Sequence, residues 1–153
     1  LILLNPINFL VLKKINKIPL KEQLRLLKQY YPESKLILNK NKGFTWEGVL
    51  KSSPLGDKYT VKVIYEVSSK PKTFVVNPEK LSLPENETRL KHVYNHDLQE
   101  LCLYYPKDKE WHEGKMIAST IIPWAIEWLY HYEIWLVTGE WHGGGVEHGN
   151  SKK

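Results

Sequence analysis

The stretch YTVKVIYEV, residues 59–67, carries the clearest strand signal in the chain. Its apolar side chains recur at every second position, and Thr60, Lys62 and Glu66 stand between them. The alternating apolar residues are Tyr59, Val61, Val63, Tyr65 and Val67. Successive side chains of a strand point to opposite faces of a sheet, so this pattern predicts a strand with one buried face.

Three more predicted strands accompany this one, at residues 34–39, 44–51 and 72–76. The connections between them, rich in Asn, Ser, Gly and Pro, lie at residues 41–43, 52–57 and 68–71. Short turns of this composition join neighbouring antiparallel strands. We therefore expect an antiparallel four-stranded meander.

A helix is predicted on each side of the strands. Leu20, Leu24, Leu27 and Tyr31 recur at helical spacing, and Pro32 ends that helix. A second helix is expected to begin at Pro123, to run to about Leu136 and to be closed by Gly139. Its predicted buried stripe is Ile121, Ala125, Trp128, Tyr132 and Trp135. This order of elements is typical of an α+β domain, with the first helix packed on one end of the sheet.

Length and composition fit one domain spanning residues 1–153. The chain has a mass of 18.0 kDa and is 42% hydrophobic and 25% charged, which is ordinary for a folded protein. Its formal charge of +5 permits attraction to nucleic acid or to an acidic protein. The lysines are scattered, so nucleic-acid binding is not expected, although a basic nucleic-acid-binding domain remains an alternative.

The apolar opening, residues 1–12, does not indicate export. It lacks a basic flank and a small-residue cleavage site, and Pro6 interrupts a stretch too short to cross a bilayer. With a single cysteine and no targeting signal, we expect a cytoplasmic protein without a membrane partner.

About forty residues without a clear pattern separate the last predicted strand from the second helix, and they contain Cys102. A lone thiol forms no internal disulfide and makes a poor metal site, which leaves two roles, buried apolar filler or nucleophile. Long irregular segments of compact domains are usually functional or disordered. The apolar residues Leu98, Leu101, Leu103 and Trp111 favour an ordered, functional segment.

The stretch KHVYNHDLQELCL, residues 91–103, followed by Trp111, resembles the active-site region of ubiquitin-conjugating enzymes. In that family a His-Pro-Asn tripeptide precedes the nucleophilic cysteine by the same ten-residue step. Here Val93 replaces the proline and Tyr94 the asparagine, with Asn95 one position later. In these departures, and in the tryptophan-rich run from residue 122 to residue 145, the chain resembles bacterial members of the family that are encoded in CBASS-type antiphage operons. The resemblance covers about residues 20–148.

This resemblance implies a ubiquitin-conjugating-enzyme-like fold with an N-terminal helix, a four-stranded antiparallel meander, an active-site loop and a C-terminal helix. It also implies a transferase in which Cys102 takes the C-terminal carboxyl group of a protein as a thioester and passes it to an amine. The implied partner is a cGAS-like nucleotidyltransferase, joined through its C-terminal glycine, with a separate adenylating enzyme as a further candidate. No cofactor is implied. An inactive binding module of the same fold is the alternative.

Two neighbours of the cysteine are candidate catalytic residues. Asn95 is a substitute donor to the oxyanion, or else an ordinary turn asparagine. His92 either orients Cys102 as a base or holds the loop in shape, and the resemblance favours the second role.

The C-terminal region offers further candidates. His142, Glu147 and His148 resemble metal ligands only weakly, and no metal is expected. The glycine run at residues 143–145 either lets the tail approach other backbone closely, bringing Trp141 and His142 near the active-site stretch, or forms a flexible linker.

Overall fold

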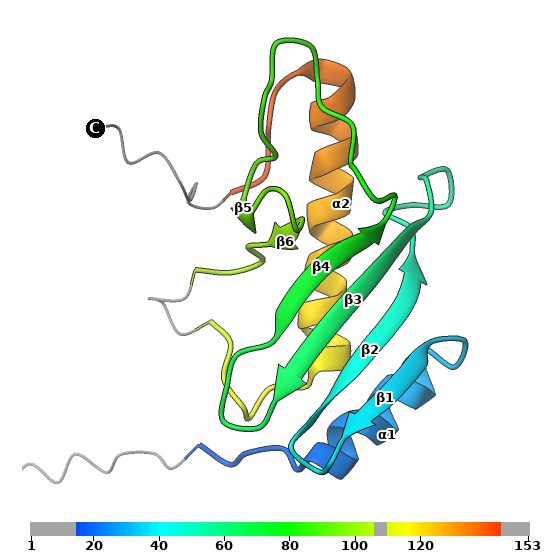
Figure 1. Cartoon of the computed structure of the whole chain (residues 1–153), viewed down its shortest axis with the longest axis vertical. Helices are drawn as coiled ribbons and strands as arrows, with labels where there is room; N and C mark the ends of the chain where they lie inside the picture. The colour runs from blue at the N-terminus through cyan, green and yellow to red at the C-terminus, as the bar shows by residue number, and fades with distance from the viewer. Residues whose placement is uncertain (1–14, 106–109, 145–153) are drawn as a thin grey trace, which may run out of the picture.

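The computed structural model describes residues 15–105 and 110–144 (Figure 1). Two α-helices, one 3-10 turn and an antiparallel sheet of six strands make up this part of the chain. The elements are α1 Leu20–Tyr30, β1 Lys35–Asn39, β2 Gly43–Leu50, β3 Tyr59–Glu66, β4 Lys72–Asn77, β5 Val93–Asn95, β6 Glu100–Leu101, η2 Ile117–Ser119 and α2 Ile121–Thr138. The structure thus confirms the α+β class.

The sheet has the strand order β1-β2-β3-β4-β6-β5, and every neighbouring pair is antiparallel. The predicted meander is confirmed for the first four strands. The predicted number of strands is wrong, because β5 and β6 extend the sheet from the segment expected to be irregular. These strands have only three and two residues, which is too short for an alternating pattern to show in the sequence.

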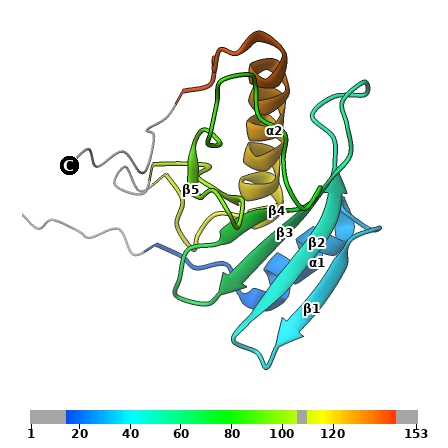
Figure 2. The ribbon, with the colours of Figure 1, turned by 45° about the horizontal axis from the view of Figure 1, so that its top comes forward.

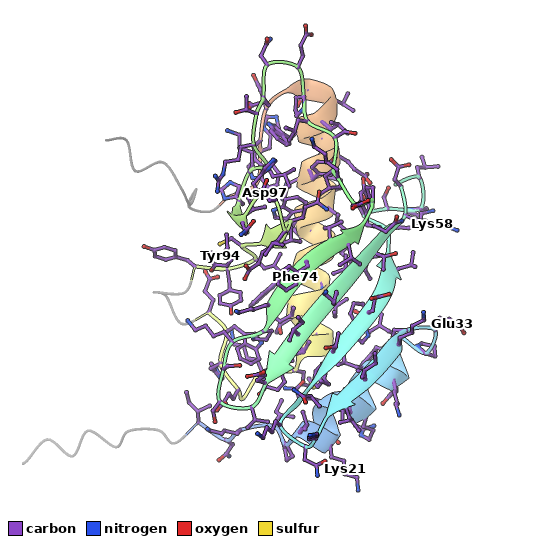
Figure 3. The ribbon with its side chains drawn as sticks, in the orientation of Figure 1. Lys21, Glu33, Lys58, Phe74, Tyr94 and Asp97 are labelled. Atoms are coloured by element: carbon purple, nitrogen blue, oxygen red, sulfur yellow. The ribbon has the colours of Figure 1, made fainter. Side chains whose placement is uncertain are left out.

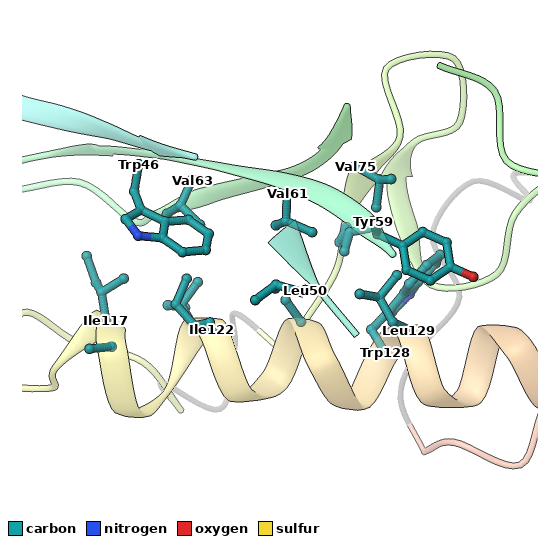
Figure 4. Packing of buried hydrophobic residues seen from close by; sticks show 14 of the residues in the cluster. Trp46, Leu50, Tyr59, Val61, Val63, Val75, Ile117, Ile122, Trp128 and Leu129 are labelled. Carbon is teal, nitrogen blue, oxygen red and sulfur yellow. The ribbon is translucent and has the colours of Figure 1, made fainter. Parts of the chain in front are cut away.

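The core lies between one face of the sheet and α2 (Figures 1 and 2). In β3, Tyr59, Val61, Val63 and Tyr65 are buried, which confirms four of the five predicted positions; Val67 follows the end of the strand and is exposed, so its predicted burial is wrong. Figure 4 shows Trp46, Val61 and Val63 on the sheet side, facing Ile122 and Leu129. Trp46 is fully buried, and its indole N–H donates to Ser34 Oγ over 2.8 Å.

Helix α2 begins at Ile121, two residues earlier than predicted. Pro123 is the third residue of the helix, where a missing N–H still leaves no intrahelical bond unmade. All five residues of the predicted stripe are buried. The helix ends at Thr138, and Gly139 follows with φ of 74° while its N–H donates to Trp135 O, as expected of a closing glycine. Within the described residues, no helix combines the length and apolar character that crossing a membrane requires.

A buried glutamine joins the two helical regions. Gln23 of α1 is fully buried; its Nε2 donates to Lys115 O and its Oε1 accepts from Ile117 N, both over 2.9 Å. The predicted apolar stripe of this helix did not include Gln23. These bonds fix the segment that leads through η2 into α2.

The substitution Gln23→Leu should destabilise the protein by about 2–3 kcal/mol, because Lys115 O and Ile117 N–H would be left buried without partners. Urea unfolding monitored by circular dichroism measures this change. The control is Gln29→Leu on the exposed part of the same helix, which should change stability by less than about 0.5 kcal/mol. Equal effects of the two substitutions would contradict the role of the Gln23 hydrogen bonds.

Candidate active site

The hairpin of β5 and β6 positions Cys102. Val93 pairs with Leu101 and Asn95 with Glu100, with an irregularity between the two pairs. Cys102 follows β6 directly, and its backbone N–H donates to His92 O over 2.9 Å. The backbone of the cysteine is therefore fixed opposite the residue that precedes β5. The hairpin lies beside α2 in both ribbon views (Figure 2).

His92 connects this hairpin to α2. His92 is buried, and its backbone is in the left-handed region with φ of 49°. The carbonyl oxygen that accepts from Cys102 also accepts from Trp128 Nε1 over 3.1 Å. The imidazole ring lies 5.0 Å from the ring of Trp141. These contacts suit a residue that holds the loop in shape, and that role for His92 remains a prediction.

Asn95 is engaged in a turn. Its Oδ1 accepts from the backbone N–H of Leu98 over 2.9 Å. The described cavity beside Cys102 does not include Asn95 among its lining residues. The register of β5 shifts between Val93 and Asn95, so regular strand alternation does not by itself place the Asn95 side chain. Its role as a donor to the oxyanion remains a prediction that this geometry does not favour.

Tyr94 contacts the thiol instead. The side chains of Tyr94 and Cys102 are hydrogen-bonded. Tyr94 lies at the hairpin beside Phe74 of β4 (Figure 3), and both line a groove of about 740 Å³ on the outer face of the sheet. The sequence alone shows Tyr94 only as the residue that stands in place of the family's asparagine. The sequence signal that could have identified Tyr94 is its position eight residues before the cysteine, within a hairpin of two strands.

The thiol of Cys102 is partly exposed, as a carrier thiol must be. The Sγ–H donates to Tyr104 O over 3.4 Å. Burial raises the pKa of the Cys102 thiol above its ordinary value, whereas the hydrogen bond from Tyr94 acts in the opposite direction. The nearby Glu110 carboxylate adds to the increase in pKa. A raised pKa reduces the thiolate fraction near neutral pH.

A cavity of about 320 Å³ lies beside the thiol. Its aromatic wall comes from Tyr104, Trp124, Trp128 and Trp141, and its polar residues are His92, Glu110, Glu127 and His131. On α2, His131 Nε2 lies 3.8 Å from Glu127 Oε1. The cavity thus offers acidic groups and flat apolar surfaces close to the Cys102 thiol.

The segment after α2 folds back onto this site. The Trp141 ring lies 5.7 Å from that of Trp128 and 5.9 Å from that of His131. A Cβ atom on Gly143 would come within 2.7 Å of Trp141 Nε1 and 2.9 Å of the His131 ring, so glycine is needed for this close approach. The close approach is thus to the side chains of Trp141 and His131 rather than to other backbone, and Trp141 lies beside the His92 ring of the active-site stretch, as expected.

The other predicted tail residues are placed differently. His142 is largely exposed, pairs with Glu140 at 3.7 Å and does not line the cavity. Gly145, Glu147 and His148 lie outside the described residues. Among residues 15–105 and 110–144, no group of three His, Cys, Asp or Glu side chains is arranged to hold a metal ion.

The family model described as "Type II CBASS E2 protein" matches residues 23–149, which include α1 from Gln23 onward, all six strands, α2 and Cys102. A search of curated proteins found no match.

The alkylation rate of Cys102 should keep rising with pH beyond the point at which an ordinary thiol levels off, because only the thiolate reacts and burial raises this pKa. Below the pKa the rate should fall by about tenfold per pH unit. Iodoacetamide labelling of the native protein, followed by intact mass from pH 7 to pH 10, measures the profile, with N-acetylcysteine as the reference. A plateau at or below that of N-acetylcysteine would show that burial does not control the thiol.

Proposed function

The chain belongs to the family of type II CBASS E2 proteins, and on this premise we propose that Cys102 carries the C-terminal carboxyl group of a protein as a thioester and transfers it to an amine. The observation that carries the proposal is the placement of the thiol. The sole cysteine of the chain is partly exposed at the edge of a cavity, with its backbone fixed by His92 O. A structural cysteine would need neither the cavity nor the exposure.

The chemistry is that of a ubiquitin-conjugating enzyme. The Cys102 thiolate attacks an activated carboxyl group, the activating group leaves, and a thioester forms. An amine then attacks the thioester carbon, the C–S bond breaks, and an amide and the free thiol result. Splitting the reaction in this way gives two easier steps, each passing through a tetrahedral oxyanion that needs a hydrogen-bond donor.

The proposed donor is the cGAS-like nucleotidyltransferase of the same defence system, through its C-terminal glycine. The CBASS family assignment supports a partner encoded with this protein. A separate adenylating enzyme would activate the carboxyl group, because the thiol alone supplies no energy for thioester formation. We place the reaction in the cytoplasm, where reducing conditions keep a lone thiol free.

The cavity beside Cys102 suits an acceptor amine. The carboxylates of Glu110 and Glu127 would attract an ammonium group, and His131 Nε2 lies where it can orient Glu127. The flat surfaces of Trp124 and Trp128 would contact the methylene groups of a lysine side chain. A purely hydrolytic site would have no need of this aromatic wall.

A binding module without catalysis is the second candidate. The observation that favours it is the raised pKa of the Cys102 thiol, which leaves less thiolate near neutral pH than a free cysteine has. The two candidates differ in whether an adduct forms on the sulfur.

The wild-type protein, mixed with the nucleotidyltransferase, the adenylating enzyme and ATP, should form an adduct that a small thiol removes. With Cys102→Ser the adduct should persist, because an oxygen ester exchanges poorly with thiols, and with Cys102→Ala no adduct should form. Non-reducing gels run with and without added thiol give the readout. Full adduct formation by Cys102→Ala would exclude the carrier mechanism and favour the binding module.

The substitution Glu127→Gln should slow transfer to free lysine about fivefold without slowing loading of Cys102, because it removes one attractive charge, about 1 kcal/mol, from the acceptor cavity. The control is Glu140→Gln, which alters the similar His142–Glu140 pair outside the cavity. Discharge of preloaded protein is followed by intact mass. Equal discharge rates for the two variants would remove Glu127 from the acceptor site.

A further inference from the structure

Tyr94 makes the direct side-chain contact with the proposed nucleophile. It is the middle residue of β5, between Val93, paired with Leu101, and Asn95, paired with Glu100. Tyr94 is thus the extra residue at the irregularity between these two pairs, and a hydrogen bond from its hydroxyl lowers the pKa of the Cys102 thiol. The contact depends on two paired strands rather than on a flexible loop, so the phenol is held in place.

The direction of this hydrogen bond follows from the second partner of the thiol. The Sγ–H donates to Tyr104 O, which leaves the lone pairs of sulfur to accept. The Tyr94 hydroxyl is therefore the donor to sulfur. Partial burial raises the pKa of the phenol above its usual value, so the hydroxyl keeps its proton at physiological pH.

We propose that Tyr94 is a catalytic residue of the acyl transfer, whose hydroxyl donates to the Cys102 sulfur in the free protein and to the thioester carbonyl oxygen when the amine attacks. This proposal rests on the carrier function above. The carbonyl oxygen of a thioester is only two bonds from sulfur, so a donor that contacts Sγ reaches it by a small rotation. Tyr94 is 41% exposed, which leaves room for that rotation.

The transfer step balances with Tyr94 as a donor alone. The amine nitrogen forms a bond to the thioester carbon, and the negative charge moves to the carbonyl oxygen, where the Tyr94 hydroxyl donates to it. When the oxyanion re-forms the C=O bond, the C–S bond breaks and its electron pair leaves on Sγ. The proton lost by the amine passes to solvent or to the thiolate, and the phenol keeps its own proton throughout.

The surroundings of Tyr94 agree with this role. The side chain of Asn95, the other candidate donor, is engaged in a turn, where its Oδ1 accepts from Leu98 N–H. Tyr94 and Tyr104 both line the groove on the outer face of the sheet, while Tyr104 also lines the cavity that contains the thiol. The phenol thus lies at the boundary between the groove and the cavity, where an acyl chain attached to sulfur must pass.

The test uses the full chain loaded chemically, which removes the need for a charging enzyme. A short peptide ending in glycine, supplied as its mercaptoethanesulfonate thioester, is exchanged onto Cys102, and discharge to free lysine is followed by intact mass. The substitution Tyr94→Phe removes only the hydroxyl and should slow discharge by about 10²-fold. The control is Tyr130→Phe, an exposed tyrosine on α2, which should discharge like the wild type.

A second readout separates catalysis from structure. Tyr94→Phe should shift the pH profile of Cys102 alkylation to higher pH, because the thiolate loses a donor, while the unfolding midpoint in urea stays within the error of the wild-type value. Tyr94→Gln, which offers an amide N–H in place of the hydroxyl, should recover part of the discharge rate. Should Tyr94→Phe prove unstable, the comparison of Tyr94→Gln with Tyr94→Leu gives the same answer.

The possible results distinguish this inference from the carrier function. Slow discharge with a shifted alkylation profile supports the role of Tyr94. Wild-type discharge and an unchanged profile in Tyr94→Phe would overturn it and leave the carrier function of Cys102 standing. If the wild-type protein took no acyl group from the peptide thioester, the carrier function and the role of Tyr94 would both fail.

Discussion

The backbone carbonyl of His92 accepts two hydrogen bonds, one from the Cys102 N–H and one from the Trp128 indole, and the candidate site depends on this pair. The first bond fixes the backbone of Cys102 against the start of β5, and the second fixes the start of β5 against α2. The left-handed backbone of His92, with φ of 49°, aims the carbonyl at both donors. A rigid helix therefore sets the position of a thiol that lies outside any long element, and no side-chain chemistry of His92 is needed for this effect.

The thiol itself is subject to opposing influences. Burial and the Glu110 carboxylate disfavour the thiolate, whereas the Tyr94 hydroxyl favours it. A carrier benefits from such a balance, because a thiol that is mostly protonated at rest is protected from oxidation and from unrelated electrophiles.

The long elements could be predicted from the sequence because their patterns extend over many residues. The alternation in residues 59–67 gives β3, and the stripe from Ile121 to Trp135 gives α2. Strands β5 and β6 are too short to show a pattern, and their pairing depends on contacts with β4 that only the folded chain provides. The candidate site at Cys102 could be recognised from its motif, whereas the position of Tyr94 near the thiol could not, because it depends on how the two short strands pair. Gln23 was missed because a polar residue buried by backbone hydrogen bonds has no hydrophobic signature.

The grouping of tryptophans around the thiol has an optical consequence. Trp124, Trp128 and Trp141 line the cavity that contains Cys102, while Trp46 and Trp111 are buried elsewhere in the core. Indole emission responds to nearby polar groups and to quenching by sulfur and carbonyl groups. A group attached to Sγ would therefore change the fluorescence of the first three tryptophans and leave that of Trp46 and Trp111 nearly constant. Intrinsic tryptophan fluorescence should thus report the state of the thiol without an added label.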